Sequence, residues 1–249
     1  MKTDIATAAF AANWKNSISD FREVWALLGF FLVDAIGAIP SLNSWLVGHF
    51  SLELGNPAGV ILSITVYDGW LNTAYLAGSA SAFFLATVSL GGIDRRKASQ
   101  FFASTSVLGA IVGNLVWYIS DKGPNLPVRG TSGVTMASIG VLLVPAIMCI
   151  SVIIVRSLKI KFLTRQEKLR WWRANWSIAN AVFWLTLICW FTALLTVYSA
   201  TGNSVIHSVS LLFGILVSTI YFMPKLKSQD PWSGMDTSTK GEQSETVAS

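Results

Sequence analysis

Six apolar segments recur along the chain, and their length constrains the fold more than any other feature does. They cover residues 24–40, 72–91, 99–120, 131–155, 176–199 and 205–223. An α-helix needs about 20 apolar residues to cross the roughly 30 Å of hydrocarbon in a bilayer. A helix in hydrocarbon also satisfies its backbone hydrogen bonds internally. We therefore expect an all-α membrane protein with six transmembrane helices, a multi-pass protein of the cell membrane.

The distribution of charge supports a membrane protein and argues against a nucleic-acid partner. Of the 249 residues, 53% are hydrophobic and only 12% are charged, whereas charged residues make up about 25% of a soluble domain. The net charge of +5 comes from basic residues between and beside the apolar segments. If the N-terminus is cytoplasmic, six spans place every Lys and Arg except Lys122 and Arg129 in the cytoplasm. This is the positive-inside pattern, and it predicts two cytoplasmic termini.

The sequence predicts one membrane domain with short ends. Residues 1–23 form a cytoplasmic N-terminal segment and residues 24–223 form the membrane domain. Residues 224–249 are rich in Ser, Thr, Gly and Glu, a composition typical of a disordered tail. Between the first two spans, residues 41–71 are interrupted by Pro and Gly, and we expect an outer loop that is partly helical and partly embedded in the membrane interface.

A short Gly-Thr-Ser-Gly sequence opens the fourth apolar segment and contains the first candidate catalytic residue, Ser132. The start of a helix has backbone N–H groups without partners in the helix, and such groups can bind the oxyanion of a tetrahedral intermediate. On its own the match is weak, because a patch of small residues that permits close helix packing explains it equally well.

The second candidate is His207, near the outer start of the sixth apolar segment. Imidazole can accept the proton of a serine hydroxyl and then protonate the leaving amine. Ser210, Gly214 and Ser218 follow at four-residue spacing, so they lie on one helix face and allow another helix to approach closely. The only other histidine, His49, lies in the outer loop.

Taken together, these features resemble the rhomboid family of intramembrane serine proteases, as a divergent member. The family has a six-helix core with its N-terminus inside, a G-x-S-G sequence at the start of the fourth helix, and a histidine followed by small residues in the sixth. The resemblance covers residues 24–223. It implies Ser132 as the nucleophile and His207 as the base. Gly130 and Gly133 match the two glycines of the G-x-S-G motif. Ser210 and Gly214 match the two small residues that follow the histidine.

The chain departs from the family near the start of the second helix and one turn after the serine. Where the family carries H-x-x-x-N, this sequence has Asn72 and Leu76. The resemblance implies that Asn72, with Gly130 and Gly133, positions the oxyanion and substrate, but Leu76 cannot donate a hydrogen bond. Loss of one donor costs about 10²–10³ in rate in other hydrolases. Met136 replaces an aromatic residue that packs against the histidine ring in the family, and a thioether orients a ring less firmly.

Three functions stay open at this point. The first is a protease that cleaves transmembrane helices near their outer ends through an acyl-enzyme on Ser132, with membrane-protein substrates and no metal or cofactor. The second, favoured by the departures at Asn72, Leu76 and Met136, is a catalytically inactive rhomboid-like protein that binds membrane clients. The third is a small transporter using Asp34 and His207, which ranks last because the chain lacks broken spans in matching halves.

Two further polar residues occur in the apolar segments. We expect Asp34 to reach water near the outer end of the first span, where an acid is otherwise costly. Asn114, in the third apolar segment, is expected to form an interhelical hydrogen bond.

Overall fold

A computed structural model describes residues 19–36, 40–53, 56–66, 69–90, 93–120, 131–159, 165–198 and 204–228. Within these ranges the chain is almost entirely helical. Most of the predicted N-terminal segment 1–23 and tail 224–249 lies outside the described residues, and so does Gly130.

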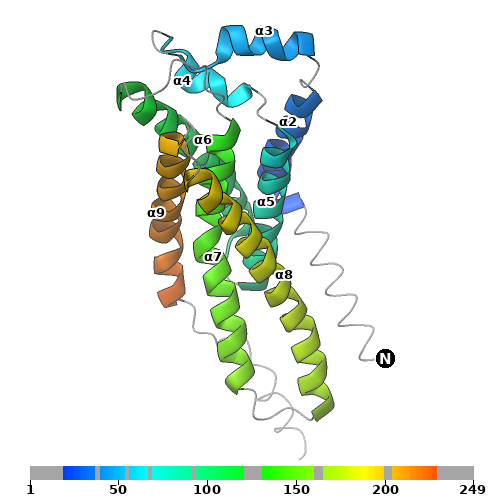
Figure 1. Ribbon diagram of the computed structural model, residues 1–249. Helices are drawn as coiled ribbons and strands as arrows, with labels where there is room; N and C mark the ends of the chain where they lie inside the picture. The colour runs from blue at the N-terminus through cyan, green and yellow to red at the C-terminus, as the bar shows by residue number, and fades with distance from the viewer. Residues whose placement is uncertain are drawn as a thin grey trace, which may run out of the picture.

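Five long helices form an elongated bundle (Figure 1). They are α5 (Trp70–Leu90), α6 (Arg95–Ser120), α7 (Thr131–Lys159), α8 (Arg165–Tyr198) and α9 (Ser204–Ser228). Each contains an apolar stretch of 21 to 26 residues, long enough to cross a membrane. The prediction of a helical multi-pass membrane protein is therefore confirmed, and five of the predicted spans coincide with helices that are long and apolar enough to cross a membrane.

The predicted first span coincides with a shorter helix, α2 (Arg22–Ile36). Its 15 residues extend over about 22 Å, less than the hydrocarbon thickness. It is not one of the five helices above, so the count of six spans stays a prediction.

The segment between α2 and α5 is partly helical, as predicted, and covers one end of the bundle (Figure 1). It contains α3 (Pro40–Phe50), α4 (Gly59–Leu62) and a short 3-10 helix, η1 (Ser63–Thr65). A Cβ on Gly59 would lie 2.6 Å from the carbonyl oxygen of Ser51, so only glycine permits this close approach. We call this end of the bundle the α3 end.

Helix α7 occupies the centre of the bundle and contacts α5, α6, α8 and α9. Every residue from 131 to 142 is buried. Both α7 and α9 begin at the α3 end, whereas α8 runs in the opposite direction (Figure 1). The first turns of α7 and α9 are therefore neighbours, as the predicted parity of the spans requires.

Candidate active site

Ser132 lies in the first turn of α7 and is 3% exposed. The first turn of a helix has backbone N–H groups without acceptors in the helix. An anion at this position would therefore be stabilised by N–H donors and by the positive end of the helix dipole.

His207 lies in the first turn of α9 and is 6% exposed. Neither ring nitrogen has a hydrogen-bond partner among the residues that the structure describes. The same is true of other buried groups, such as Trp190 Nε1 and Thr131 Oγ1, and the backbone of Thr196 lies beside the His207 ring.

Close packing beside each residue brings Ser132 and His207 together. Gly133 follows the serine and Ile206 precedes the histidine. A Cβ on Gly133 would lie 3.3 Å from Cγ2 of Ile206 and 3.2 Å from Ala110. Glycine at position 133 therefore lets the first turn of α7 approach the first turn of α9.

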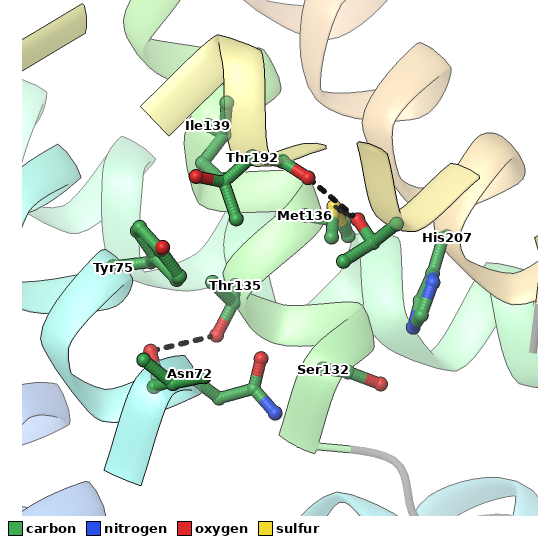
Figure 2. Close-up of a pocket in the computed structure, with 10 residues that line it drawn as sticks. Asn72, Tyr75, Ser132, Thr135, Met136, Ile139, Thr192 and His207 are labelled. Carbon is green, nitrogen blue, oxygen red and sulfur yellow. Dashed lines mark hydrogen bonds between the residues drawn. The ribbon is translucent and has the colours of Figure 1, made fainter. Parts of the chain in front are cut away.

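Both residues line a cavity of about 230 Å³ between α5, α7, α8 and α9. Figure 2 shows the His207 ring and the Ser132 side chain at its edge, with a nitrogen of the ring on the side of the serine. The lining consists of Leu71, Asn72, Tyr75, Ser132, Thr135, Met136, Ile139, Thr192, Thr196 and His207. Among the described residues, this lining contains no carboxylate, so none of them gives the imidazole a negatively charged partner.

Asn72 forms part of the α5 side of the cavity. The hydroxyl of Thr135 donates to its backbone carbonyl over 3.2 Å, which ties the start of α5 to α7. Figure 2 shows the Asn72 amide extending into the cavity on the side of Ser132. The resemblance implies an oxyanion donor at this position, and the structure places the residue in the same cavity lining as Ser132.

Leu76, one turn after Asn72, does not line the cavity. It is fully buried in an apolar cluster with Phe31, Ala110 and Val134. The second position of the family's donor pair is therefore turned toward the protein core, where a leucine contributes packing and no polar contact.

Met136 follows Ser132 by one turn of α7 and lines the same cavity. It is 3% exposed and packs in a cluster with Ile139, Cys189, Ala193 and Leu211. The hydroxyl of Thr196, on α8, donates to its sulfur over 3.9 Å. This contact links α8 to the helix that carries the serine.

Ser210 and Gly214 lie on α9 but outside the cavity lining, where they pack the helix against its neighbours. Ser210 Oγ donates to the carbonyl of Gly109 on α6 over 3.0 Å. Cα of Gly140 lies 3.1 Å from the position of a Cβ on Gly214. The small residues of α9 therefore permit close packing of α6, α7 and α9, as their spacing predicts.

The remaining candidates lie elsewhere in the fold. Asn114 donates to the Val60 carbonyl and to Ser63 Oγ, each over 3.0 Å, and so joins α6 to the segment containing α4. His49 is exposed on α3 and stacks on Trp45 with ring centroids 4.8 Å apart. Asp34 belongs to α2, and its side chain lies outside the described residues.

Several lining residues were not identified from the sequence, chiefly Thr192 and Thr196 of α8. Their four-residue spacing within an apolar span was an available signal, because two hydroxyls on one helix face indicate a polar surface. Among the described residues, no group of His, Cys, Asp and Glu could hold a metal ion.

Comparison of the chain with models of known protein families, with curated proteins and with solved structures finds no match. The resemblance to rhomboid proteases therefore depends on the sequence motifs.

Proposed function

We propose that this protein is an intramembrane serine protease of the rhomboid type, which cleaves transmembrane helices near their outer ends. One observation carries the proposal: Ser132 and His207, from the first turns of separate helices, line the same cavity. An imidazole in this cavity supports a role in proton transfer, because it can accept the hydroxyl proton of Ser132 and then protonate the leaving amine.

In the proposed reaction, His207 takes the proton of Ser132 as Oγ attacks the carbonyl carbon of the substrate. The N–H groups of the first turn of α7 and the amide of Asn72 stabilise the oxyanion. Collapse of the tetrahedral intermediate breaks the C–N bond, and His207 protonates the leaving amine. Water then attacks the acyl-Ser132 ester with His207 as the base, and release of the acid restores both residues. The hydrogen bond between Ser132 and His207 is proposed to form in the complex with substrate, since catalytic hydrogen bonds often tighten only there.

The proposal includes six spans, with residues 24–40 as the first and with both termini cytoplasmic. Both native cysteines are buried, so single introduced cysteines can be labelled against a low background. An impermeant maleimide should label Lys122→Cys in right-side-out vesicles and Lys2→Cys only after inversion. The reverse pattern, or labelling of both from one side, would contradict this topology.

The catalytic proposal is tested with the purified protein in liposomes, a fluorophosphonate probe and a transmembrane substrate with a helix-destabilising Gly near its outer end. Wild-type protein should be labelled and should cleave the substrate, and Ser132→Ala should lower both rates by at least about 10³-fold. Ser151→Ala is the matched control, because Ser151 is an exposed serine of the same helix. Labelling that persists in Ser132→Ala would exclude the proposed nucleophile.

A second candidate is the catalytically inactive client-binding protein, which the burial of Leu76 in the core favours. It predicts a folded wild type that neither reacts with the probe nor cleaves the substrate, yet retains the substrate during purification. The same experiment therefore distinguishes the two functions.

A further inference from the structure

Helix α8 extends well beyond its apolar part. The helix begins at Arg165, but its apolar window begins only at Trp176. At 1.5 Å per residue, residues 165–175 add about 16 Å of helix, at the end of the bundle remote from the α3 end (Figure 1). The headgroup layer on each side of a bilayer is roughly 5–8 Å thick. In a membrane, the turns just before Trp176 are therefore at the depth of the lipid headgroups.

This extension of α8 is strongly basic. It contains Arg165, Lys168, Arg170 and Arg173 but only one acidic residue, Glu167. A single carboxylate can offset one positive charge, so the segment keeps a surplus of three. Basic residues beside a transmembrane helix are attracted to the negative surface of a leaflet that contains anionic lipids.

The described neighbours show which face of the helix two of these basic residues occupy. Residues four apart lie nearly on one face of an α-helix. Position 173 lies four residues after Leu169 and four before Ser177, and both of these side chains are exposed. Position 170 lies four residues after Gln166, which is exposed as well. Arg170 and Arg173 therefore belong to the exposed face of the extension.

This exposed face continues along the apolar part of α8. From position 170, steps of seven residues reach Ser177, Trp184 and Phe191, and all three are exposed. The exposed fractions of the two aromatic side chains are 56% and 62%. In a membrane this face contacts lipid tails, so a lipid that lies along it has its headgroup beside positions 170 and 173.

We propose that Arg170 and Arg173 bind the phosphate of an anionic phospholipid, such as phosphatidylglycerol, whose acyl chains lie along the exposed face of α8. A guanidinium can donate two parallel hydrogen bonds to one phosphate. Trp176, which is 45% exposed, belongs to the residue type that is enriched at the membrane interface. Lipid forms most of the surroundings of α8, because only 28% of its apolar window is buried in the protein. Lipid binding at this position is independent of the proposed protease function.

The test measures binding of phosphatidylglycerol to the purified full-length protein in detergent by native mass spectrometry, with phosphatidylcholine as the zwitterionic probe. Wild type should prefer phosphatidylglycerol. One basic residue near an anionic surface changes affinity about fivefold, so Arg170→Gln and Arg173→Gln should each weaken this binding by about that factor. Lys168→Gln is the matched control, because position 168 lies three turns before the buried Ala179, and it should leave the affinity unchanged.

Three results would overturn the proposal. An equal loss in Lys168→Gln would mean that net charge, and not position on the exposed face, sets the affinity. Equal binding of the two lipids by the wild type would mean that the headgroup charge is not recognised. Displacement of the lipid by inorganic phosphate would indicate a site for free anions. Both arginines lie on an exposed face, so the variants should unfold at the wild-type temperature, and thermal unfolding in detergent checks this.

Discussion

The two sides of the cavity are built in different ways. On one side, α7 and α9 meet through their backbones at Gly140 and Gly214, where a Cβ on either glycine would strike the other helix. Ser218 adds a hydrogen bond to the Val141 carbonyl over 2.8 Å. On the other side, α8 presents a narrow buried stripe formed by Ala179, Val182, Cys189 and Ala193.

The amount of burial reflects this difference. Over their apolar windows, 56% of α7 is buried in the protein but only 28% of α8. Lipid tails are as apolar as the side chains themselves, so helix association in a membrane depends on close packing and polar contacts. The α7–α9 contact has both, and it positions Ser132 and His207. Helix α8 is the least buried of the five long helices over its apolar window.

The largest effect is expected at the α7–α9 contact. A Cβ on Gly140 would lie 3.0 Å from the backbone nitrogen of Ile215 and would strike the Leu211 carbonyl. Backbone atoms cannot move aside as a side chain can, so Gly140→Ala should cost about 3 kcal/mol or more. Thermal unfolding in detergent measures the loss. Gly29→Ala is the control, because a Cβ there meets nothing within 4 Å and alanine favours a helix by about 0.5–1 kcal/mol. Equal stability of the two variants would contradict close α7–α9 contact.

The next effect concerns the α5 side of the cavity. Asn72→Ala removes the proposed oxyanion donor and should lower kcat about 10²-fold. The hydrogen bond from Thr135 to the backbone carbonyl of Asn72 does not involve the removed side chain, and thermal unfolding of the variant measures any loss of stability separately from kcat. Asn114→Ala provides the opposite case: it removes a buried amide with two bonds, so stability should fall while kcat is retained. An unchanged kcat in Asn72→Ala would assign the oxyanion to backbone donors alone.

The sequence predicted the long helices well, because hydropathy measures the length of a span directly. The fourth segment was predicted to start at residue 131, where α7 begins. The fifth was predicted to start at 176, but α8 begins at Arg165. The extra residues are basic and therefore have low hydropathy, so a hydropathy pattern cannot show that the helix extends beyond the hydrocarbon. For the first span, predicted at 24–40, the structure describes α2 as far as Ile36, and residues 37–39 lie outside the described ranges.

The site was predictable only in part. Ser132 and His207 could be paired because each opens a helix and the parity of the spans brings those openings to one end. The rotation of a helix about its axis was not predictable, since lipid-facing and core-facing positions are both apolar in a membrane. For this reason the burial of Leu76 and the place of Thr196 in the cavity lining became visible only in the structure.

A smaller effect is expected from the hydrogen bond beside the two glycines. Ser218 is fully buried and bonds the Val141 carbonyl. Interhelical hydrogen bonds of this kind contribute about 0.6 kcal/mol on average, so Ser218→Ala should lower the free energy of unfolding by about that amount. Thr219→Val, which removes a bond within one helix, should cost less. A larger loss in Thr219→Val would show that the polar contact adds little to the α7–α9 association.

The connection between α2 and α6 combines apolar packing with a charged residue, Glu23. Ser99 Oγ donates to Glu23 over 2.9 Å. Burial opposes ionisation, but hydrogen bonds from Arg22, the backbone, Ser99 and Gln100 outweigh it and lower the pKa of Glu23 to about 2 from 4.5. Because the pKa is lower in the folded state, this stabilisation is complete above pH 4.5 and is lost as the pH falls toward 2.

Glu23→Gln should therefore remove part of the acid sensitivity of unfolding between pH 4.5 and pH 2. At neutral pH it should cost less than about 0.5 kcal/mol, since partly exposed ion pairs contribute little. Unfolding by chemical denaturant at several pH values measures the difference. Identical pH dependence in the variant and the wild type would mean that Glu23 has a normal pKa in the folded protein.

The smallest effect is expected on the outer face of α8. Phe191 is 62% exposed and Phe183 is 45% exposed, so in a membrane both would contact lipid tails. Replacing either with alanine leaves no cavity and exchanges one apolar contact with lipid for another, so stability should change by less than about 0.5 kcal/mol. Unfolding of Phe191→Ala and Phe183→Ala in the same detergent tests this. A loss above about 1 kcal/mol, dependent on protein concentration, would show that a second copy covers this face, and α8 would then be held as firmly as α9.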